Sequence, residues 1–153
     1  MRLLIDADAC PVVQSALSIA QKHEIAVLLI CDDAHQMERE GAETIVVSRG
    51  ADSADFRLVN LLHPGDLVVT QDYGLAAMCI ARGAEVLDQN GREYTAENID
   101  GLLWQRHAAQ KFRRAGGRTK GPPKRTPEQN KEFEQALETL ILRRARMGSP
   151  ARA

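Results

Sequence analysis

Five short runs of apolar, β-type residues alternate with segments of helical periodicity, and this alternation is the strongest constraint on the fold. The runs are LLI, VLLIC, TIVVS, LVVT and EVL, at residues 3–5, 27–31, 44–48, 67–70 and 85–87. Continuous apolar runs of this length are typical of strands buried on both faces of a parallel sheet. Helices are predicted from Val12 to Ala20, with Pro11 in the first turn, and over 56–62 and 75–80. The pattern therefore predicts a doubly wound α/β sandwich, with its ligand site beyond the carboxyl ends of the strands.

The chain after the fifth strand is predicted to complete this domain with a hairpin and a helix. The stretch DQNGREY at 88–94 is typical of a turn or hairpin, and Thr95 can cap a helix that runs toward His107. The sheet domain is therefore expected to span residues 1–110.

Two further segments and a tail are predicted beyond this domain. Residues 111–126 are basic and interrupted by glycine and proline, which favours a loop or linker. Thr126 and Gln129 form a helix start of the capping-box type, and the helix predicted over 127–147 is amphipathic, so it must dock on the domain. Residues 148–153 are expected to be a frayed tail.

Charge is distributed unevenly along the chain. The formal net charge is only -1, but residues 1–100 carry 17 Asp and Glu against 7 Lys and Arg. Residues 101–127, in contrast, carry 8 Lys and Arg and no acid. No apolar run approaches the roughly 20 residues that span a bilayer, and the first run is too short for a signal peptide. A cytoplasmic protein without membrane contact is therefore expected.

The three cysteines, Cys10, Cys31 and Cys79, are well separated and never form a CxxC pair. This spacing indicates neither a disulfide framework nor a zinc site. We expect reduced thiols that are mostly buried. Cys10 lies beside the first acids, but carboxylates would raise its pKa, so a packed thiol is expected there rather than a nucleophile.

Carboxylates follow two predicted strands at the edge where a ligand is expected. Asp6 and Asp8 end the first strand and Asp72 follows the fourth, and these strands are neighbours where the strand order reverses. Asp52 and Asp55 can share one helical face near the same edge. Two unit charges about 4 Å apart repel by about 4 kcal/mol at an effective dielectric constant of 20, so the cluster needs protons or a cation. Hard oxygen ligands select Mg²⁺ or Mn²⁺.

Each acid, taken alone, also has a purely structural interpretation. An aspartate after a strand is usually a cap or turn residue, and Asp8 alone is better explained as a cap of the first helix. Asp52 or Asp55 could cap the helix that follows them. Only the convergence of these acids on one edge favours a metal site.

Four ordered motifs, DADACPV, GADSADF, GDLVVTQDYGLA and RAGGRTKGPP, resemble those of the YaiI/YqxD family of small bacterial proteins. The resemblance covers roughly the whole chain up to the last helix. That family is similar to the PIN-like group, so the resemblance implies a five-stranded parallel sheet of order 3-2-1-4-5 in a three-layer α/β/α sandwich, here with a C-terminal helical extension. It also implies an acidic pocket that binds Mg²⁺ or Mn²⁺ for nuclease chemistry.

The resemblance assigns roles to the acids. The implied catalytic residues are Asp6, Asp8 and Asp72, and the implied metal ligands are Asp6, Asp52, Asp55 and Asp72. Many PIN-like nucleases carry a further acid shortly after the last of these, where this chain has Tyr73 and Gly74.

The leading hypothesis is a Mg²⁺- or Mn²⁺-dependent nuclease that acts on RNA or another nucleic acid, with RNA ranked before DNA. The missing acid after Asp72 favours a non-catalytic nucleic-acid-binding or adaptor protein as the alternative. A second alternative is a phosphatase of the haloacid-dehalogenase type, because a strand followed by DxD also opens that fold. Such an enzyme needs a lysine for the phosphoryl group, and Lys22 is the only lysine in the first hundred residues.

The basic segment is the predicted nucleic-acid interface. We expect it to fold back beside the acidic pocket and to bind the phosphate backbone without reading bases, since it has one aromatic residue, Phe112, for stacking. A solvated linker is the alternative. The predicted contact residues are Lys111, Arg113, Arg114, Arg118, Lys120, Lys124 and Arg125.

Overall fold

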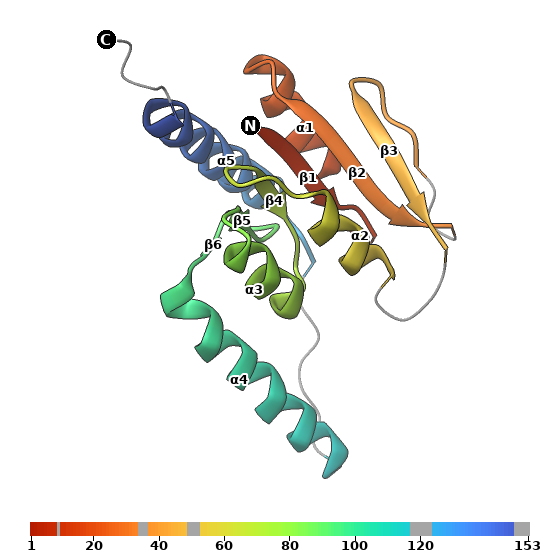
Figure 1. Cartoon of the computed structure of the whole chain (residues 1–153). Helices are drawn as coiled ribbons and strands as arrows, with labels where there is room; N and C mark the ends of the chain where they lie inside the picture. The colour runs from red at the N-terminus through yellow and green to blue at the C-terminus, as the bar shows by residue number, and fades with distance from the viewer. Residues whose placement is uncertain (9, 34–36, 49–52, 117–123, 149–153) are drawn as a thin grey trace.

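The computed structural model describes residues 1–8, 10–33, 37–48, 53–116 and 124–148. Its centre is a six-stranded sheet of order β3-β2-β1-β4-β5-β6 (Figure 1). The strands are β1 (Arg2–Asp6), β2 (Ala26–Asp32), β3 (Ala42–Val47), β4 (Leu67–Val69), β5 (Glu85–Leu87) and β6 (Glu93–Tyr94).

All strand pairs from β3 to β5 are parallel, and only β6 is antiparallel to its neighbour. The predicted α/β class and the order 3-2-1-4-5 are therefore confirmed. The sixth strand arises because the hairpin predicted at 88–94 returns the chain beside β5, where Leu87 pairs with Glu93.

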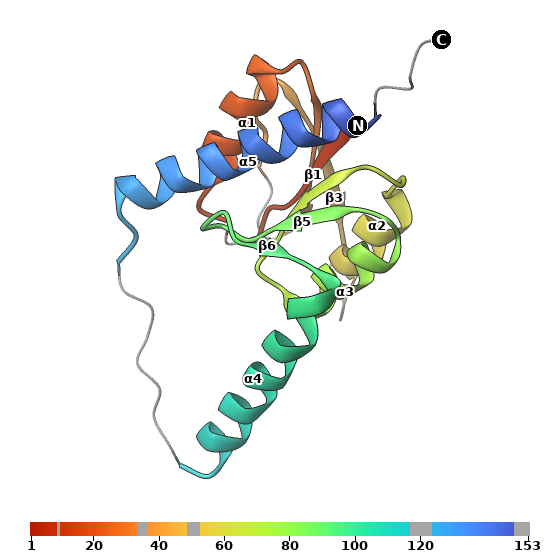
Figure 2. The same cartoon turned by 90° about the vertical axis from the view of Figure 1, so that its left-hand side faces the viewer.

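Helices cover both faces of the sheet and make it a three-layer structure (Figures 1 and 2). One face carries α1 (Val13–Lys22) and α5 (Pro127–Gly148). The other face carries α2 (Ser53–Leu61), α3 (Tyr73–Ala81) and α4 (Ala96–Arg114). In the described part of the chain, no helix is long and apolar enough to cross a membrane.

The sheet is apolar on both sides because successive residues of a strand point to opposite faces. Leu3 and Ile5 of β1 pack in the cluster beneath α1 and α5, whereas Leu4 packs in the cluster beneath α2 and α3. This is the physical reason for the continuous apolar runs in the sequence.

Two helix boundaries differ from the predictions. The first helix begins at Val13 rather than in the turn that contains Pro11, and its N-cap residue is Val12. The fourth helix continues to Arg114, so Lys111, Phe112 and the arginines that follow are helical rather than part of a linker. No proline or glycine interrupts 102–114, and good helix formers there let the helix continue.

The last helix is held against the sheet by its apolar stripe and by the β5–β6 hairpin. Phe133 and Leu137 are fully buried in the cluster that also contains α1. At the hairpin tip, Gly91 has a φ of +84°, and a Cβ atom there would lie 2.7 Å from the Cβ of Ala136. Glycine is needed at this position both for its backbone conformation and for the close approach of α5.

Candidate active site at the carboxyl edge of the sheet

Asp6, at the end of β1, forms the centre of the candidate site. Ile5 pairs with Val69 of β4, so Asp6 lies level with Thr70, the residue after β4. The Thr70 hydroxyl donates a hydrogen bond of 2.8 Å to Oδ2 of Asp6 and accepts one of 3.0 Å from the backbone N–H of Asp72. Thr70 is only 2% exposed, so this link is shielded from water.

The sequence prediction did not include Thr70. The residue ends the apolar run LVVT two positions before a predicted site acid. A buried polar group needs a partner, so the hydroxyl at that point was a signal for its role.

Asp72 is positioned by the start of α3. It is the N-cap residue of that helix, and its Oδ1 accepts hydrogen bonds of 2.9 Å from the N–H of Gly74 and 3.1 Å from the N–H of Leu75. These bonds satisfy two of the N–H groups that have no partner within the helix. Asp72 therefore has a structural role in addition to any chemical one.

Asp8 links the ends of β1 and β2. Both of its carboxylate oxygens lie 3.2 Å from the backbone nitrogen of Asp32, which donates to them. The N-cap residue of α1, Val12, makes no side-chain cap bond, and the bonds described for Asp8 join it to β2 rather than to the start of α1. The hydrogen-bond partner lies on the neighbouring parallel strand, which local sequence cannot reveal.

The electrostatics of the site follow from this crowding of acids. The pKa of Asp6 is raised from 3.8 to about 6, first by burial and then by the charges of Asp8 and Asp72, although the hydrogen bond from Thr70 opposes the shift. Asp55 of α2 acts on the Cys79 thiol. Burial is the main cause that raises the pKa of this thiol, and the charges of Asp55 and Asp6 raise it further. Asp6 therefore lies within electrostatic reach of Asp8 and Asp72, and Asp55 acts on the same thiol as Asp6.

The metal-ligand prediction is not tested by this arrangement. Asp52 lies outside the described residues. Among the residues that are described, no three His, Cys, Asp or Glu side chains form a group that could hold a metal ion. The predicted ligands Asp6, Asp55 and Asp72 lie at the end of β1, in α2 and at the N-cap position of α3, respectively.

Arg125, just before α5, is a cation that acts on the Cys10 thiol beside this edge. Its guanidinium donates to the carbonyl oxygen of Gln89 at 2.7 Å and to the side-chain oxygens of Asn90 at 2.9 Å and Asn130 at 2.7 Å. All three acceptors are neutral. Burial and Asp6 raise the pKa of the Cys10 thiol, and Arg125 opposes this shift, which puts the guanidinium within electrostatic reach of the thiol that follows β1.

The other predicted nucleic-acid contacts lie in different places. Arg118 and Lys120 are outside the described residues. Lys124 is exposed just before α5, and Lys111 and Arg114 are exposed on α4. The backbone of Arg113 belongs to the same helix.

The cysteines are free thiols, and the buried acid before β4, Asp66, has a structural role. Cys31 and Cys79 are buried and Cys10 is partly buried, and all three are free thiols. Asp66 lies at the opposite, amino edge, where it accepts hydrogen bonds from the backbone and side chain of Arg2 and from the N–H of His63. Burial raises the pKa of Asp66, but these bonds lower it below its usual value.

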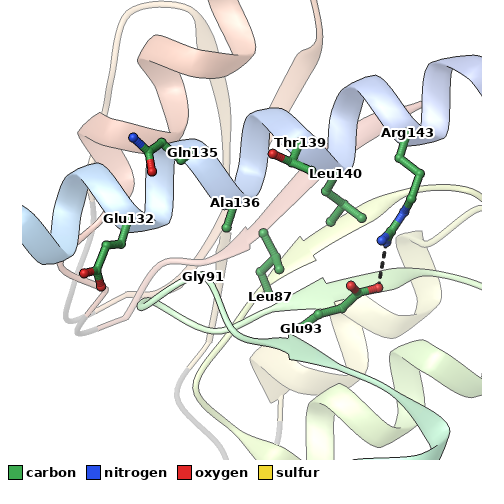
Figure 3. Close-up of a pocket in the computed structure, with 9 residues that line it drawn as sticks. All are labelled: Leu87, Gly91, Glu93, Glu132, Gln135, Ala136, Thr139, Leu140 and Arg143. Carbon is green, nitrogen blue, oxygen red and sulfur yellow. Dashed lines mark hydrogen bonds and ion pairs between the residues drawn. The ribbon is translucent and has the colours of Figure 1, made fainter.

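A groove of about 410 Å³ lies between α5 and the β5–β6 hairpin, away from the carboxylates (Figure 3). Its wall carries Arg143, which forms an ion pair of 2.8 Å with Glu93 and approaches Glu85 at 3.7 Å. The lining also includes a second acid, Glu132, and none of the candidate site acids lines the groove.

Comparison with known proteins finds a family and close relatives. The family model described as "Uncharacterized BCR, YaiI/YqxD family" matches residues 4–143. A "UPF0178 protein" of Exiguobacterium sibiricum is 53% identical over 141 residues, which cover 92% of this chain and 96% of the relative. Relatives of the same name from Clostridium acetobutylicum and Bacillus thuringiensis are 46% and 44% identical, over 94% and 92% of this chain and 98% and 99% of their own lengths. No solved structure matches the chain significantly.

Proposed function

We propose that this chain, which belongs to the YaiI/YqxD family, is a Mg²⁺- or Mn²⁺-dependent nuclease that cleaves RNA rather than DNA. One observation supports the proposal above the others. Asp6 is held by the buried Thr70 hydroxyl, and its pKa responds to both Asp8 and Asp72. The charges of two further acids therefore act on Asp6 at the edge where parallel sheets bind ligands.

The donor atoms suit a hard cation. Asp6, Asp55, Asp72 and, from the resemblance, Asp52 would hold it through carboxylate oxygens. Mg²⁺ is commonly bound by only one or two carboxylates together with waters and substrate phosphates, so a complete protein cage is not required. A cation held there would supply Lewis-acid chemistry, by lowering the pKa of a water and offsetting negative charge on a phosphate.

The protein's own residues would orient the reaction in this proposal. Thr70 fixes the rotamer of Asp6, and the start of α3 fixes that of Asp72. Asp8 is the candidate base for the proton of the attacking water. Arg125, held by neutral acceptors, retains a full positive charge with which to attract the substrate backbone.

Cleavage assays with matched variants test the proposal. Purified protein would be incubated with labelled single-stranded RNA and DNA oligonucleotides, with Mn²⁺ or with EDTA. Asp6→Asn should reduce the rate of RNA cleavage by about 100-fold or more, whereas Asp100→Asn, at an exposed acid of α4, should not. Equal rates for wild type and Asp6→Asn, or undiminished cleavage in EDTA, would refute the nuclease.

A non-catalytic nucleic-acid-binding protein is the second candidate, and the capping role of Asp72 favours it. Oδ1 of Asp72 is already engaged by two N–H groups of α3, so this acid can be explained without catalysis. Tight oligonucleotide binding without cleavage at any concentration of Mg²⁺ or Mn²⁺ would select this candidate.

The phosphatase alternative is weakened by the position of its required lysine. Lys22 lies near the end of α1, where its Nζ pairs with Glu138 of α5 at 2.7 Å. It therefore stabilises helix packing rather than standing beside Asp6. Phosphate trapped covalently on Asp6 during turnover of a phosphomonoester would favour the phosphatase over the nuclease.

A further inference from the structure

Helix α4 is packed along only part of its length. Its apolar contacts come from the first two turns, where Ile99 and Leu102 are buried against α3. Beyond them the helix runs away from the sheet and from the other helices, as Figures 1 and 2 show from two directions. We call the part from Trp104 to Arg114 the α4 arm.

The α4 arm exposes two large aromatic side chains. Trp104, the only tryptophan of the chain, is 70% exposed, and Phe112 is 54% exposed. They are eight residues apart, which is about 12 Å along the helix axis and about 80° around it. Trp104 also points away from the buried positions, since Leu102 is about 160° from it around the axis. The aromatic pair therefore belongs to the solvent-facing side of the helix.

The exposed part of the arm carries positive charge without any acid. Lys111 is seven residues after Trp104 and lies within about 20° of it around the axis, between the two aromatic side chains and Arg114, whereas the exposed Arg114 lies about 80° from Trp104 on the flank away from Phe112. From Gly101 to Pro127 the sequence has no Asp or Glu. A helix without tertiary contacts is only marginally stable in water, so a bound partner would stabilise the arm. Large exposed aromatic side chains are also typical of binding surfaces.

We propose that the α4 arm is a binding platform for single-stranded nucleic acid, on which bases stack against Trp104 and Phe112 while Lys111 and Arg114 contact phosphates. Aromatic side chains among cations, with no nearby acid, are the combination that unpaired strands require. The positive charge of the arm complements a polyanion and is opposite in sign to the net charge of the first hundred residues. Stacking was expected from Phe112 alone, and Trp104 provides a second surface.

This inference deepens the proposed function, on which it rests for the choice of RNA as substrate. The arm would capture the strand, and the carboxylate edge of the sheet would act on it. Because stacking accepts every base, the platform should bind without strong sequence preference.

Trp104 makes the proposal directly measurable, because all tryptophan fluorescence of this protein reports on the arm. The full chain would be titrated in EDTA with a uridine oligomer of about 15 nucleotides, so that binding is separated from cleavage. The expected result is strong quenching of the emission. Phe112→Ala should weaken the affinity about tenfold, and Lys111→Gln with Arg114→Gln should lower the salt slope by about 0.7 for each charge removed.

Two variants on α5 serve as matched controls. Met147 is 68% exposed, close to the value for Trp104, and Arg146 is an exposed arginine. Met147→Ala and Arg146→Gln should leave affinity and salt slope unchanged. Circular dichroism should give the same helix content for every variant. Trp104→Leu has no tryptophan emission, so its affinity is measured with a labelled oligomer and should be about tenfold weaker than that of wild type.

Several results would overturn the platform. The proposal fails if the oligomer does not quench the emission, or if Phe112→Ala binds as tightly as wild type. It also fails if a second copy of the chain covers the arm. In that case the protein would form a concentration-dependent dimer that Trp104→Leu abolishes, and the oligomer would not change the tryptophan emission.

The platform and the nuclease can fail separately. Metal-dependent cleavage with wild-type kcat/KM in both aromatic variants would refute the platform and leave the nuclease intact. Quenching by the oligomer without any cleavage would support the platform and refute the nuclease.

Discussion

Replacement of Asp6 by Asn should make the protein more stable at neutral and alkaline pH. The folded state raises the pKa of Asp6 from 3.8 to about 6, chiefly because burial disfavours the charged form. The folded protein therefore holds this proton more tightly than the unfolded chain does. Stability is highest below pH 4 as far as this group is concerned, and it falls as pH rises from about 4 to about 6.

The magnitude follows from the size of the shift. A difference of 6 minus 3.8, or about 2.2 pKa units, corresponds to about 3 kcal/mol at most. Asp6 retains some exposure, so solvent screening should reduce the measured value to about 2 kcal/mol. Asn keeps a carbonyl oxygen that can accept the hydrogen bond from Thr70, so the substitution removes the charge and little else.

Urea unfolding of wild type and Asp6→Asn at intervals from pH 4 to pH 8 measures the effect. The difference in unfolding free energy should be near zero at pH 4 and should favour the variant by about 2 kcal/mol at pH 8. Titrating groups that do not interact with Asp6 are common to both proteins and cancel in the difference, whereas the loss of repulsion with Asp8 and Asp72 is part of the effect measured. This prediction would be refuted if the difference in unfolding free energy did not change with pH, or if the variant were less stable at pH 8. Either result would show that the site does not disfavour the charged form of Asp6.

Three further substitutions test other parts of the structure. Thr70→Val should raise the pKa of Asp6 further, because the hydroxyl hydrogen bond lowers it; a lower or unchanged midpoint in an NMR titration of that carboxyl would contradict this. Asp66→Ala leaves the guanidinium of Arg2 without its buried carboxylate and should cost about 3–5 kcal/mol in urea unfolding, and a loss under 1 kcal/mol would count against that role. Gly91→Ala should lower the unfolding free energy by about 1–3 kcal/mol because the new methyl group meets α5, so an unchanged melting temperature would be inconsistent with the packing described.

The sequence by itself determined the five parallel strands, the presence of the helices and the edge at which the acids lie. Strands buried on both faces must be apolar throughout, so their positions are visible as continuous runs. Asp6 and Asp72 follow two such runs, and the carboxyl ends of parallel strands meet at one edge. Their proximity could therefore be predicted without coordinates.

The contacts that shape the site depended on the tertiary structure. Thr70 and Asp6 are 64 residues apart, and Asp8 and Asp32 are 24 apart. Which of two nearby acids turns toward a given N–H depends on strand register and side-chain rotamer, and neither is encoded in local periodicity. For this reason the bond from the N–H of Asp32 to Asp8 was not predicted, and Thr70 was missed.

The same distinction applies to α4. Periodicity identifies a helix there in spite of Gly101, and it places Ile99 and Leu102 on its apolar side. It does not say where the neighbouring elements end. Only the packed structure decides that α3 supports the first turns and that Trp104 and Phe112 remain in water, because exposure depends on which surfaces chain folding brings together rather than on the residues of the helix itself.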